Sequence, residues 1–170
     1  MITVKIENKA LREAYALLEK ATPLGCADCG LACGAVCCTD KTGDSMELFP
    51  YEKELFASLD CFEIVDGEVP LVKCNGNCLR EQRPLACRIY PLFPLVVEKD
   101  GEEEIRVIYD PRASRACPLA VERVRLDRRF LRAVRRAGKY LLRDKETADY
   151  LRKTSEFLKD LIELEYKLNS

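Results

Sequence analysis

Residues 26–38, CADCGLACGAVCC, contain five of the ten cysteines in this 170-residue chain. Thiols this dense can form disulfides, can lie scattered as small apolar side chains, or can converge as thiolates on a soft metal or an iron-sulfur cluster. Gly25, Gly30 and Gly34 allow backbone amides to turn inward toward sulfur atoms. The stretch therefore predicts a loop wrapped around a site.

A second block, residues 74–91 (CNGNCLREQRPLACRIYP), is expected to supply the other half of this site. Its three cysteines are Cys74, Cys78 and Cys87. The Asn-Gly-Asn sequence after Cys74 favours a tight turn, and Pro84 restricts the approach of the chain to the third cysteine. Cys117, directly before a proline, follows at a distance and is a further candidate.

The composition, 48% hydrophobic and 34% charged, indicates one soluble domain over residues 1–170. Lysine and arginine number 28 against 29 for aspartate and glutamate, so the net charge favours neither nucleic acid nor membranes. The N-terminus carries charges too early for a secretory signal, and no segment approaches the roughly 18 apolar residues of a membrane span. We therefore expect a cytoplasmic protein without a membrane partner.

That location bears on the cysteines, because a reducing cytosol keeps most thiols unpaired and makes a metal site more common than a disulfide framework. The chain has no histidine, which removes the usual nitrogen ligand and the commonest general base. A metal bound here would be held mainly by sulfur. Sites of this kind favour zinc or iron-sulfur clusters.

Apolar periodicity and turn residues predict the elements around the cysteines. Helices are expected over residues 7–21, about 50–59, 127–142 and 146–168, and strand pairs over 62–72, turning at Asp66-Gly67, and over 95–98 with 105–109, turning at Asp100-Gly101. Asp144 is a candidate cap for the last helix, and the last two helices are expected to pack as an antiparallel pair.

These elements predict an α+β fold. We expect a small cysteine-rich metal-binding core with short β-hairpins over about residues 24–118. An N-terminal helix and a C-terminal helical pair, the latter over about residues 122–168, are expected to flank it.

The two cysteine blocks resemble the YkgJ-like cysteine-cluster family, described as a zinc- or iron-chelating domain with eight characteristic cysteines. The first block matches at Cys29, Cys33, Gly34, Cys37 and Cys38, and the second at Cys74, Cys78, Arg83, Pro84, Cys87, Arg88, Tyr90 and Pro91. The resemblance covers about residues 26–94. The chain departs from the family in longer gaps before Cys37, in the additional Cys26, and in lacking a tyrosine soon after Cys78.

The resemblance implies metal or cluster binding, but it implies no shared reaction. The leading ligands are Cys29, Cys33, Cys37, Cys38, Cys74, Cys78, Cys87 and Cys117, with Cys26 in reserve. Arg83 and Arg88 flank Cys87 and are expected to offset the negative charge of the thiolates, the alternative being ordinary surface salt bridges. Cys61 stands alone between a helix and a strand and is expected to be a buried, inert thiol.

Zinc and iron-sulfur remain alternatives. Structural zinc sites usually show paired C-x2-C knuckles, and only Cys26 and Cys29 have that spacing. Three-residue gaps, the adjacent pair Cys37-Cys38 and a remote cysteine before proline favour an iron-sulfur cluster, of the 4Fe-4S type. The eight or nine candidates suffice for two four-thiolate sites or for one site with spare thiols.

Three function classes follow from this. The first is a redox, electron-transfer or accessory protein with a protein partner, and the second is a zinc-stabilised structural or interaction module. The third is a component of a methyltransferase-like enzyme, because a flagellin lysine methylase is similar to the family in its cysteine block. The chain has no glycine-rich nucleotide loop and no evident catalytic carboxylate pair, so no catalytic residue is assigned.

A basic run over residues 123–139 contains seven arginines and one lysine. Such a run can meet phosphates or an acidic protein. Because it lacks interleaved aromatic residues, we favour a solvated helix face, neutralised by the acidic turn at residues 102–104 and by the acidic last helix.

Overall fold

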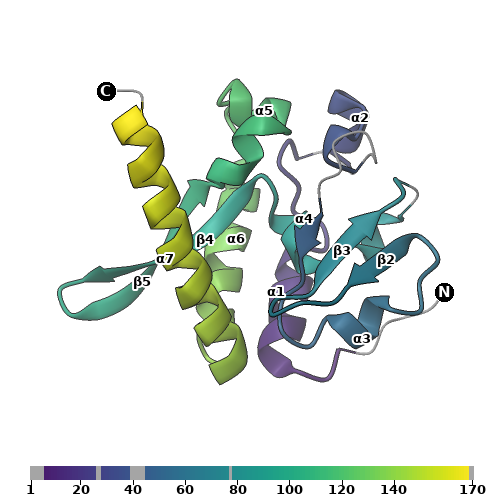
Figure 1. Ribbon diagram of the computed structural model, residues 1–170, viewed down its shortest axis with the longest axis horizontal. Coiled ribbons are helices and arrows are strands. Elements are labelled where there is room, and N and C mark those ends of the chain that lie inside the picture. Colours follow the sequence, from purple (N-terminus) through teal and green to yellow (C-terminus); the bar gives the residue numbers. More distant parts are fainter. Residues whose placement is uncertain (1–5, 26–27, 39–44, 77, 169–170) are drawn as a thin grey trace.

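The computed structural model describes residues 6–25, 28–38, 45–76 and 78–168, without the side chains of Cys38 and Arg115. Its elements form an α+β fold, as expected (Figure 1). The α-helices are α1 (Lys9–Leu18), α2 (Gly30–Cys33), α3 (Lys53–Phe56), α4 (Leu85–Ile89), α5 (Pro118–Val121), α6 (Arg128–Leu141) and α7 (Lys145–Leu168). Short 3-10 turns lie at Val36–Cys38, Arg80–Gln82 and Pro111–Arg115.

The strands form two separate antiparallel sheets. A three-stranded sheet has the order β1-β3-β2, and a two-stranded ribbon pairs β4 with β5. The strands are β1 (Met46–Glu47), β2 (Phe62–Val65), β3 (Leu71–Cys74), β4 (Leu92–Lys99) and β5 (Glu102–Tyr109). Both predicted hairpins are confirmed, and each extends at least as far as the sequence indicated.

The β4-β5 ribbon is the centre of the C-terminal half, with α6 behind it and α7 in front (Figure 1). Residues 92–96 of β4 are all buried, because both faces of this strand are covered. A buried hydrogen bond of 2.8 Å runs from the backbone nitrogen of Val96 to Ser155 Oγ of α7. The prediction that the last two helices pack mainly against each other as an antiparallel pair is therefore wrong, because the ribbon separates most of α6 from α7.

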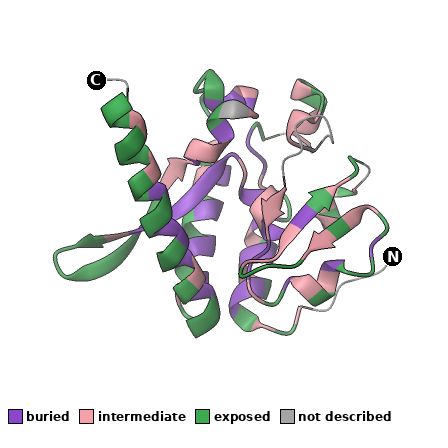
Figure 2. Ribbon diagram, in the orientation of Figure 1, coloured by how far each residue is buried: buried purple, intermediate pink, exposed green. Residues whose placement is uncertain are grey.

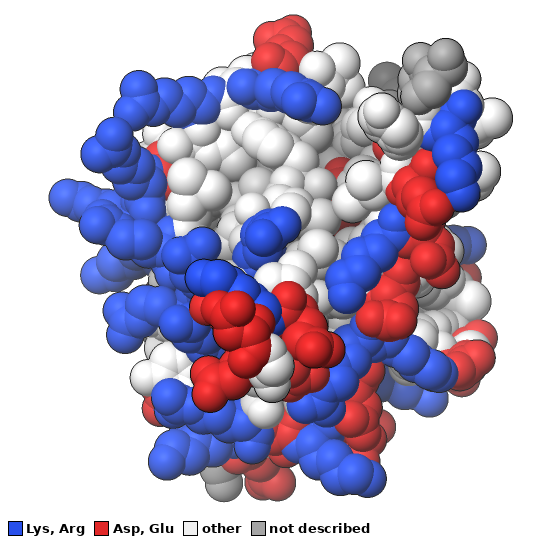
Figure 3. Space-filling view, turned by 90° about the vertical axis from the view of Figure 1, so that its left-hand side faces the viewer, with Lys and Arg blue, Asp and Glu red and all other residues white. Residues whose placement is uncertain are grey.

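Helix α6 packs chiefly on α1. Both helices turn apolar faces inward, with Leu11 and Leu18 of α1 and Phe130 and Val134 of α6 fully buried (Figure 2). The outer face of α6 carries arginines, and Lys and Arg side chains gather along one side of the molecule (Figure 3). This packing explains why α6 is strongly amphipathic.

The hydrophobic core consists of aliphatic and aromatic side chains from α1, α6, β4 and neighbouring segments. Among the described cysteines only Cys117 is buried, with 4% of its surface exposed, while the others are partly exposed. The expectation of a cysteine-rich core is therefore not confirmed, because apolar side chains stabilise the fold and the thiols lie at its edge. None of the helices in the described parts of the chain is both long and apolar enough to cross a membrane.

Candidate metal centre

The described cysteines occupy one edge of the molecule, although they come from distant parts of the chain. They are Cys29, Cys33, Cys37, Cys61, Cys74, Cys78, Cys87 and Cys117. We call the segments that carry these cysteines the cysteine edge; in Figure 1, α2 and α5 lie at the top, whereas α4 lies nearer the middle of the molecule. Cys26 and the side chain of Cys38, both predicted ligands, lie outside the described residues.

Three thiols form what we call the helix group: Cys29, Cys33 and Cys117. Cys29 directly precedes α2 and Cys33 ends it, so one helical turn separates them. Cys117 directly precedes α5, which brings it to the same place from the other half of the chain. Each of the three thiols interacts electrostatically with at least one of the others. The helix group therefore joins the first cysteine block to the remote cysteine, as the sequence predicted.

Two further predicted ligands are Cys37 and Cys87. Cys37 lines a cavity together with Ala86 and Ala116. These two alanines directly precede Cys87 and Cys117 in the sequence. The wall of this cavity therefore brings Cys37 toward segments that adjoin Cys87 and Cys117.

The other thiols form a second set, the hairpin group: Cys61, Cys74 and Cys78. Antiparallel pairing of β2 with β3 places Phe62 opposite Cys74, so Cys61 and Cys74 lie at the same end of the hairpin. The amide of Asn75 donates to the carbonyl oxygen of Cys61 at 3.1 Å, and the amide of Gly76 donates to Cys74 Sγ at 3.4 Å. Cys78 interacts with Cys74.

Sequence reasoning set Cys61 aside, and the structure places it beside a predicted ligand. The signal that could have found it is the strand register. With a hairpin turning near Asp66-Gly67, a residue just before the first strand and one at the end of the second strand face each other. The pairing therefore relates Cys61 to Cys74 even though thirteen positions separate them.

Arg83 connects the two cysteine blocks. Its guanidinium donates to both carboxylate oxygens of Asp28, from NH1 to Oδ1 at 3.0 Å and from NH2 to Oδ2 at 2.7 Å. Asp28 precedes Cys29 and also accepts from the Gly30 amide at 2.9 Å, while Arg83 interacts with Cys78 on its other side. The pair lowers the pKa of Asp28 and raises that of Arg83, so both groups are ionised.

One atom of Arg83 lacks a hydrogen-bond partner. Its Nε is buried, and within the described part of the chain no acceptor lies in hydrogen-bonding position. A buried, unpaired N–H of a charged group is costly, so Nε needs an acceptor beyond those that the described residues supply. An anionic sulfur centre next to Cys78 fits that requirement.

Arg88 has a different role from the one expected for it. It is buried, and it donates from Nε to the Arg83 carbonyl oxygen and from NH2 to the Glu81 carbonyl oxygen, both at 2.9 Å. Its guanidinium carbon lies 4.6 Å from the centre of the Tyr15 ring. These contacts hold the segment before Cys87 in place, so Arg88 is a positioning residue for the loop.

A buried carboxyl group fixes the start of α4, the helix that carries Cys87. Glu52 is fully buried and accepts hydrogen bonds from the Phe49 and Leu85 amides, each at 2.8 Å, and from the Tyr15 hydroxyl. Burial raises the pKa of Glu52 to about 7. The carboxyl group therefore ties α1, α3 and α4 together beneath the cysteine edge.

Burial also affects the thiols themselves. It raises the pKa of Cys29 to about 11, helped by the neighbouring Asp28, and the pKa of Cys78 to about 12, partly opposed by Arg83. The pKa of Cys117 is raised by burial as well. These thiols are protonated near neutral pH, so a metal ion that binds them must displace protons.

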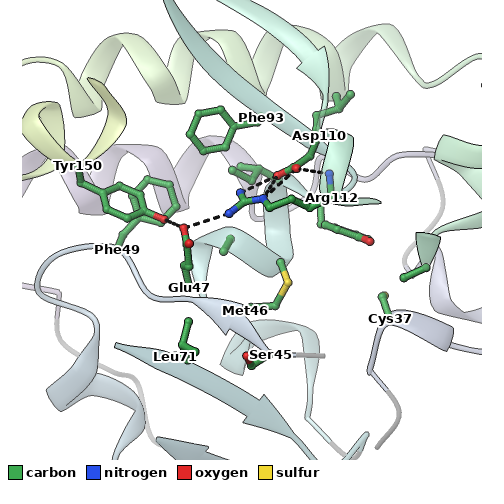
Figure 4. A pocket seen from close by; sticks show the side chains of 15 residues that line it. Cys37, Ser45, Met46, Glu47, Phe49, Leu71, Phe93, Asp110, Arg112 and Tyr150 are labelled. Carbon is green, nitrogen blue, oxygen red and sulfur yellow. Dashed lines mark hydrogen bonds and ion pairs between the residues drawn. The ribbon is translucent and has the colours of Figure 1, made fainter. Parts of the chain in front are cut away.

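A cavity of about 310 Å³ adjoins this edge (Figure 4). Arg112 lies in its wall between two carboxylates, 2.7 Å from Asp110 and 3.2 Å from Glu47. The Tyr150 hydroxyl donates to Glu47 at 2.8 Å, and Cys37 lies on the opposite side of the cavity from Tyr150 (Figure 4). The cavity thus combines an ion-pair network with a wall that belongs to the cysteine edge.

Within the described residues, no three cysteine, aspartate or glutamate side chains converge closely enough to hold a metal ion as they stand. Comparisons with protein-family models, with curated proteins and with solved structures each found no match. The function therefore has to be inferred from the chemistry of the cysteine edge and its surroundings.

Proposed function

We propose that the cysteine edge binds an iron-sulfur cluster through thiolates, and that the protein serves as a redox, electron-transfer or accessory protein of the YkgJ-like type. The observation that carries the proposal is the buried Nε of Arg83, which has no hydrogen-bond partner among the described residues, in a side chain that interacts with thiols of both cysteine blocks. Four thiolates create a negative site, and hydrogen bonds and cations around such a centre stabilise it.

The helix group, Cys29, Cys33 and Cys117, would supply three ligands of one cluster. Cys37 or Cys87 would supply the fourth. A cluster that thiolates hold at several separated positions must draw these segments together, and metal binding is coupled to folding for this reason. The hairpin group contains two of the family-like cysteines, Cys74 and Cys78, and would hold a second centre or remain as spare thiols.

The surface around these cysteines supports a role with a protein partner. Leu31 in α2 and Leu79 beside Cys78 are 86% and 57% exposed. Exposed apolar side chains next to partly exposed thiols give a partner both a contact area and a short path to the cluster. Electron transfer needs no further catalytic group, which agrees with a chain that has no histidine.

A second candidate function is a component of a methyltransferase-like enzyme. The observation that favours it is the cavity between Cys37 and Tyr150, since small-molecule sites are concave and carry a few polar groups among apolar ones. Arg112, Glu47 and Asp110 pair mainly with one another, so this candidate has less support than cluster binding.

The test is purification without oxygen, followed by a visible spectrum and by iron, zinc and sulfide analysis. We expect a brown protein with a broad band and about four iron and four sulfide per chain for one 4Fe-4S cluster, or twice that for two. Cys117→Ser should lose the helix-group cluster. Cys61→Ser, the matched control, should keep it.

A colourless protein with stoichiometric zinc would replace this proposal with a zinc-stabilised interaction module. Protein with neither metal would contradict metal binding altogether. If the protein holds one cluster, equal loss of iron from the Cys61 and Cys117 variants would contradict the assignment of that cluster to the helix group.

A further inference from the structure

The outer face of α6 and its flanks carries eight exposed cations, which we call the basic surface. They are Arg125, Arg128, Arg129, Arg132, Arg135, Arg136, Lys139 and Arg143. Figure 3 shows Lys and Arg gathered along the left-hand side of this view, while Asp and Glu lie mostly toward the centre and right. Because the whole chain has a net charge of −1, the remaining surface is acidic.

The acids that could neutralise the basic surface are engaged elsewhere. Glu103 pairs with Arg152 at 2.7 Å and Glu104 with Lys99 at 4.0 Å. On α7, Glu156 pairs with Lys159 and Glu163 with Lys167. No ion pair between described residues includes a member of the basic surface. Within the described residues, the acidic turn and the last helix therefore form no ion pair with the basic surface.

The cations are held in regular rows by the fold. The opposite face of α6 is buried against α1 and the β4-β5 ribbon, so the helix cannot rotate or insert elsewhere. Arg128, Arg132, Arg135 and Lys139 follow one another at three or four residues along one side of the helix. At about 1.5 Å of rise per residue this row is ~16 Å long. Over such a length one nucleic-acid strand presents about five phosphates.

The basic surface also includes a hollow. An open depression of about 430 Å³ lies between Leu24 and the start of α6, and four members of the basic surface line it: Arg125, Arg128, Arg129 and Arg132. Asp127, which also lines it, accepts from the Arg129 and Phe130 amides as the N-cap of α6. Guanidinium groups in a concave surface are suited to phosphate oxygens, which they bind in a bidentate manner.

We propose that the basic surface binds the phosphate backbone of double-stranded nucleic acid. The absence of large exposed apolar or aromatic side chains on α6 argues against single strands, which need stacking platforms. It also argues against a membrane, which an amphipathic helix binds by burying its apolar face. An acidic protein partner is less suited, since protein interfaces centre on apolar anchors. This inference is independent of the proposed cluster.

The test is fluorescence anisotropy with a labelled 20-base-pair DNA duplex and an RNA duplex of the same length, titrated at several salt concentrations. The variant combines Arg129→Ala, Arg132→Ala and Arg136→Ala, three cations on one side of α6. The matched control combines Arg152→Ala, Lys159→Ala and Lys167→Ala, three ion-paired cations on α7. Both variants lose the same charge.

We expect the unmodified protein to bind a duplex with affinity that falls steeply as salt rises. The α6 variant should bind at least tenfold more weakly. The slope of the logarithm of its binding constant against the logarithm of salt concentration should be smaller in magnitude by about 2.7, at ~0.9 per lost phosphate contact. The α7 control should stay within about threefold. Iron content and melting temperature of both variants should match the unmodified protein, which separates this inference from the proposed cluster.

Several results would overturn the inference. One is that the protein binds no duplex at low salt, and another is that both variants lose the same duplex affinity. Tighter binding to a single strand than to the duplexes would also overturn it, as would tighter binding to vesicles of anionic phospholipid or to poly-glutamate. The last two results would assign the basic surface to a membrane and to an acidic protein, respectively.

Discussion

Arg83 has more than one task, because its guanidinium binds Asp28 and also interacts with Cys78, while its buried Nε has no partner among the described residues. In Arg83→Met the Asp28 carboxylate would lose two hydrogen bonds while remaining partly buried. We expect the free energy of unfolding to fall by about 1–2 kcal/mol, less than for a fully buried pair because Asp28 is 28% exposed. Urea unfolding measures this, and iron release to a chelator should also become faster.

Arg152→Met is the control for this prediction. It removes an arginine with a comparable two-bond contact to a carboxylate, Glu103, but both side chains are more than 40% exposed. A change of at most about 0.5–1 kcal/mol and unaltered iron release are expected. If Arg83→Met and Arg152→Met change the unfolding free energy and the rate of iron release equally, Arg83 has no specific role at the thiols.

Glu52 makes stability depend on pH. Its pKa rises by burial from 4.5 to about 7, so between these values the folded protein keeps a proton that the unfolded chain has released. The free energy of unfolding attributable to this group is therefore highest below pH 4.5, falls as pH rises to about 7, and is constant above. The fall is on the order of 3 kcal/mol. Glu52→Gln should abolish this component, as urea unfolding at several pH values would measure.

The quantity to follow across pH is the difference in unfolding free energy between the original protein and each variant, Glu52→Gln or its control. Glu54→Gln, on the exposed side of the same short helix, should leave the pH dependence unchanged. If the original protein and Glu52→Gln show parallel pH profiles, the buried carboxyl group does not titrate in this range.

The residues of the candidate site could be predicted only in part from the sequence. Cysteine spacing together with the family resemblance selected Cys29, Cys33 and Cys117, which lie together. It could not select Cys61, because proximity to Cys74 arises from strand pairing rather than from local spacing. It assigned Arg83 and Arg88 to the same task, although Arg83 interacts with Cys78 while Arg88 donates to backbone carbonyl groups, because the rotamer of each side chain is set by tertiary contacts.

At the scale of elements, the strongly patterned segments were predicted well. The helices expected over residues 7–21, 127–142 and 146–168 are α1, α6 and α7, and Asp144 accepts from the Thr147 amide at 3.1 Å as the predicted cap. Helices α2, α4 and α5 were missed, since four or five residues carry too little periodicity. The prediction that α6 packs mainly on α7 was wrong because the sequence of a helix with one apolar stripe does not reveal which element covers that stripe.

Gly138 illustrates how packing overrides helix propensity. Alanine is favoured over glycine within helices by about 1 kcal/mol, so the sequence alone suggests that Gly138→Ala would stabilise α6. In the structure, a Cβ atom there would lie 2.7 Å from Pro94 Cβ and 3.1 Å from Ile105 Cγ2. We expect Gly138→Ala to lower the free energy of unfolding by about 1–3 kcal/mol, measured by urea unfolding, because α6 must move off the ribbon.

Lys139→Ala is the control, since it introduces alanine at the next, exposed position of α6. Its effect should stay within about 0.5 kcal/mol. A more stable Gly138→Ala protein would show that α6 and the β4-β5 ribbon are packed less closely than the distances indicate.

At the scale of the whole molecule, structure and chemistry occupy different places. Much of the apolar core lies between α1, α6, α7 and the ribbon, whereas the described thiols belong to short helices and hairpin ends, and all of them except Cys117 are partly exposed. Longer elements with buried faces are stable without a ligand, and short ones are not. This separation limits how far metal binding should control folding.

Removal of the metal should therefore loosen one edge of the molecule and leave the rest folded. After treatment with a chelator and reductant, we expect faster amide hydrogen exchange in residues 28–38 and 78–87. Exchange in α1, α6 and α7 should stay nearly unchanged, because their protection comes from apolar burial, as in Leu11, Phe130 and Leu151. Mass spectrometry of deuterated peptides measures both, with Cys117→Ser as a variant that should resemble the chelated protein before treatment. Loss of protection throughout the chain would mean instead that the thiol-bound metal, rather than the apolar core, determines whether this protein folds.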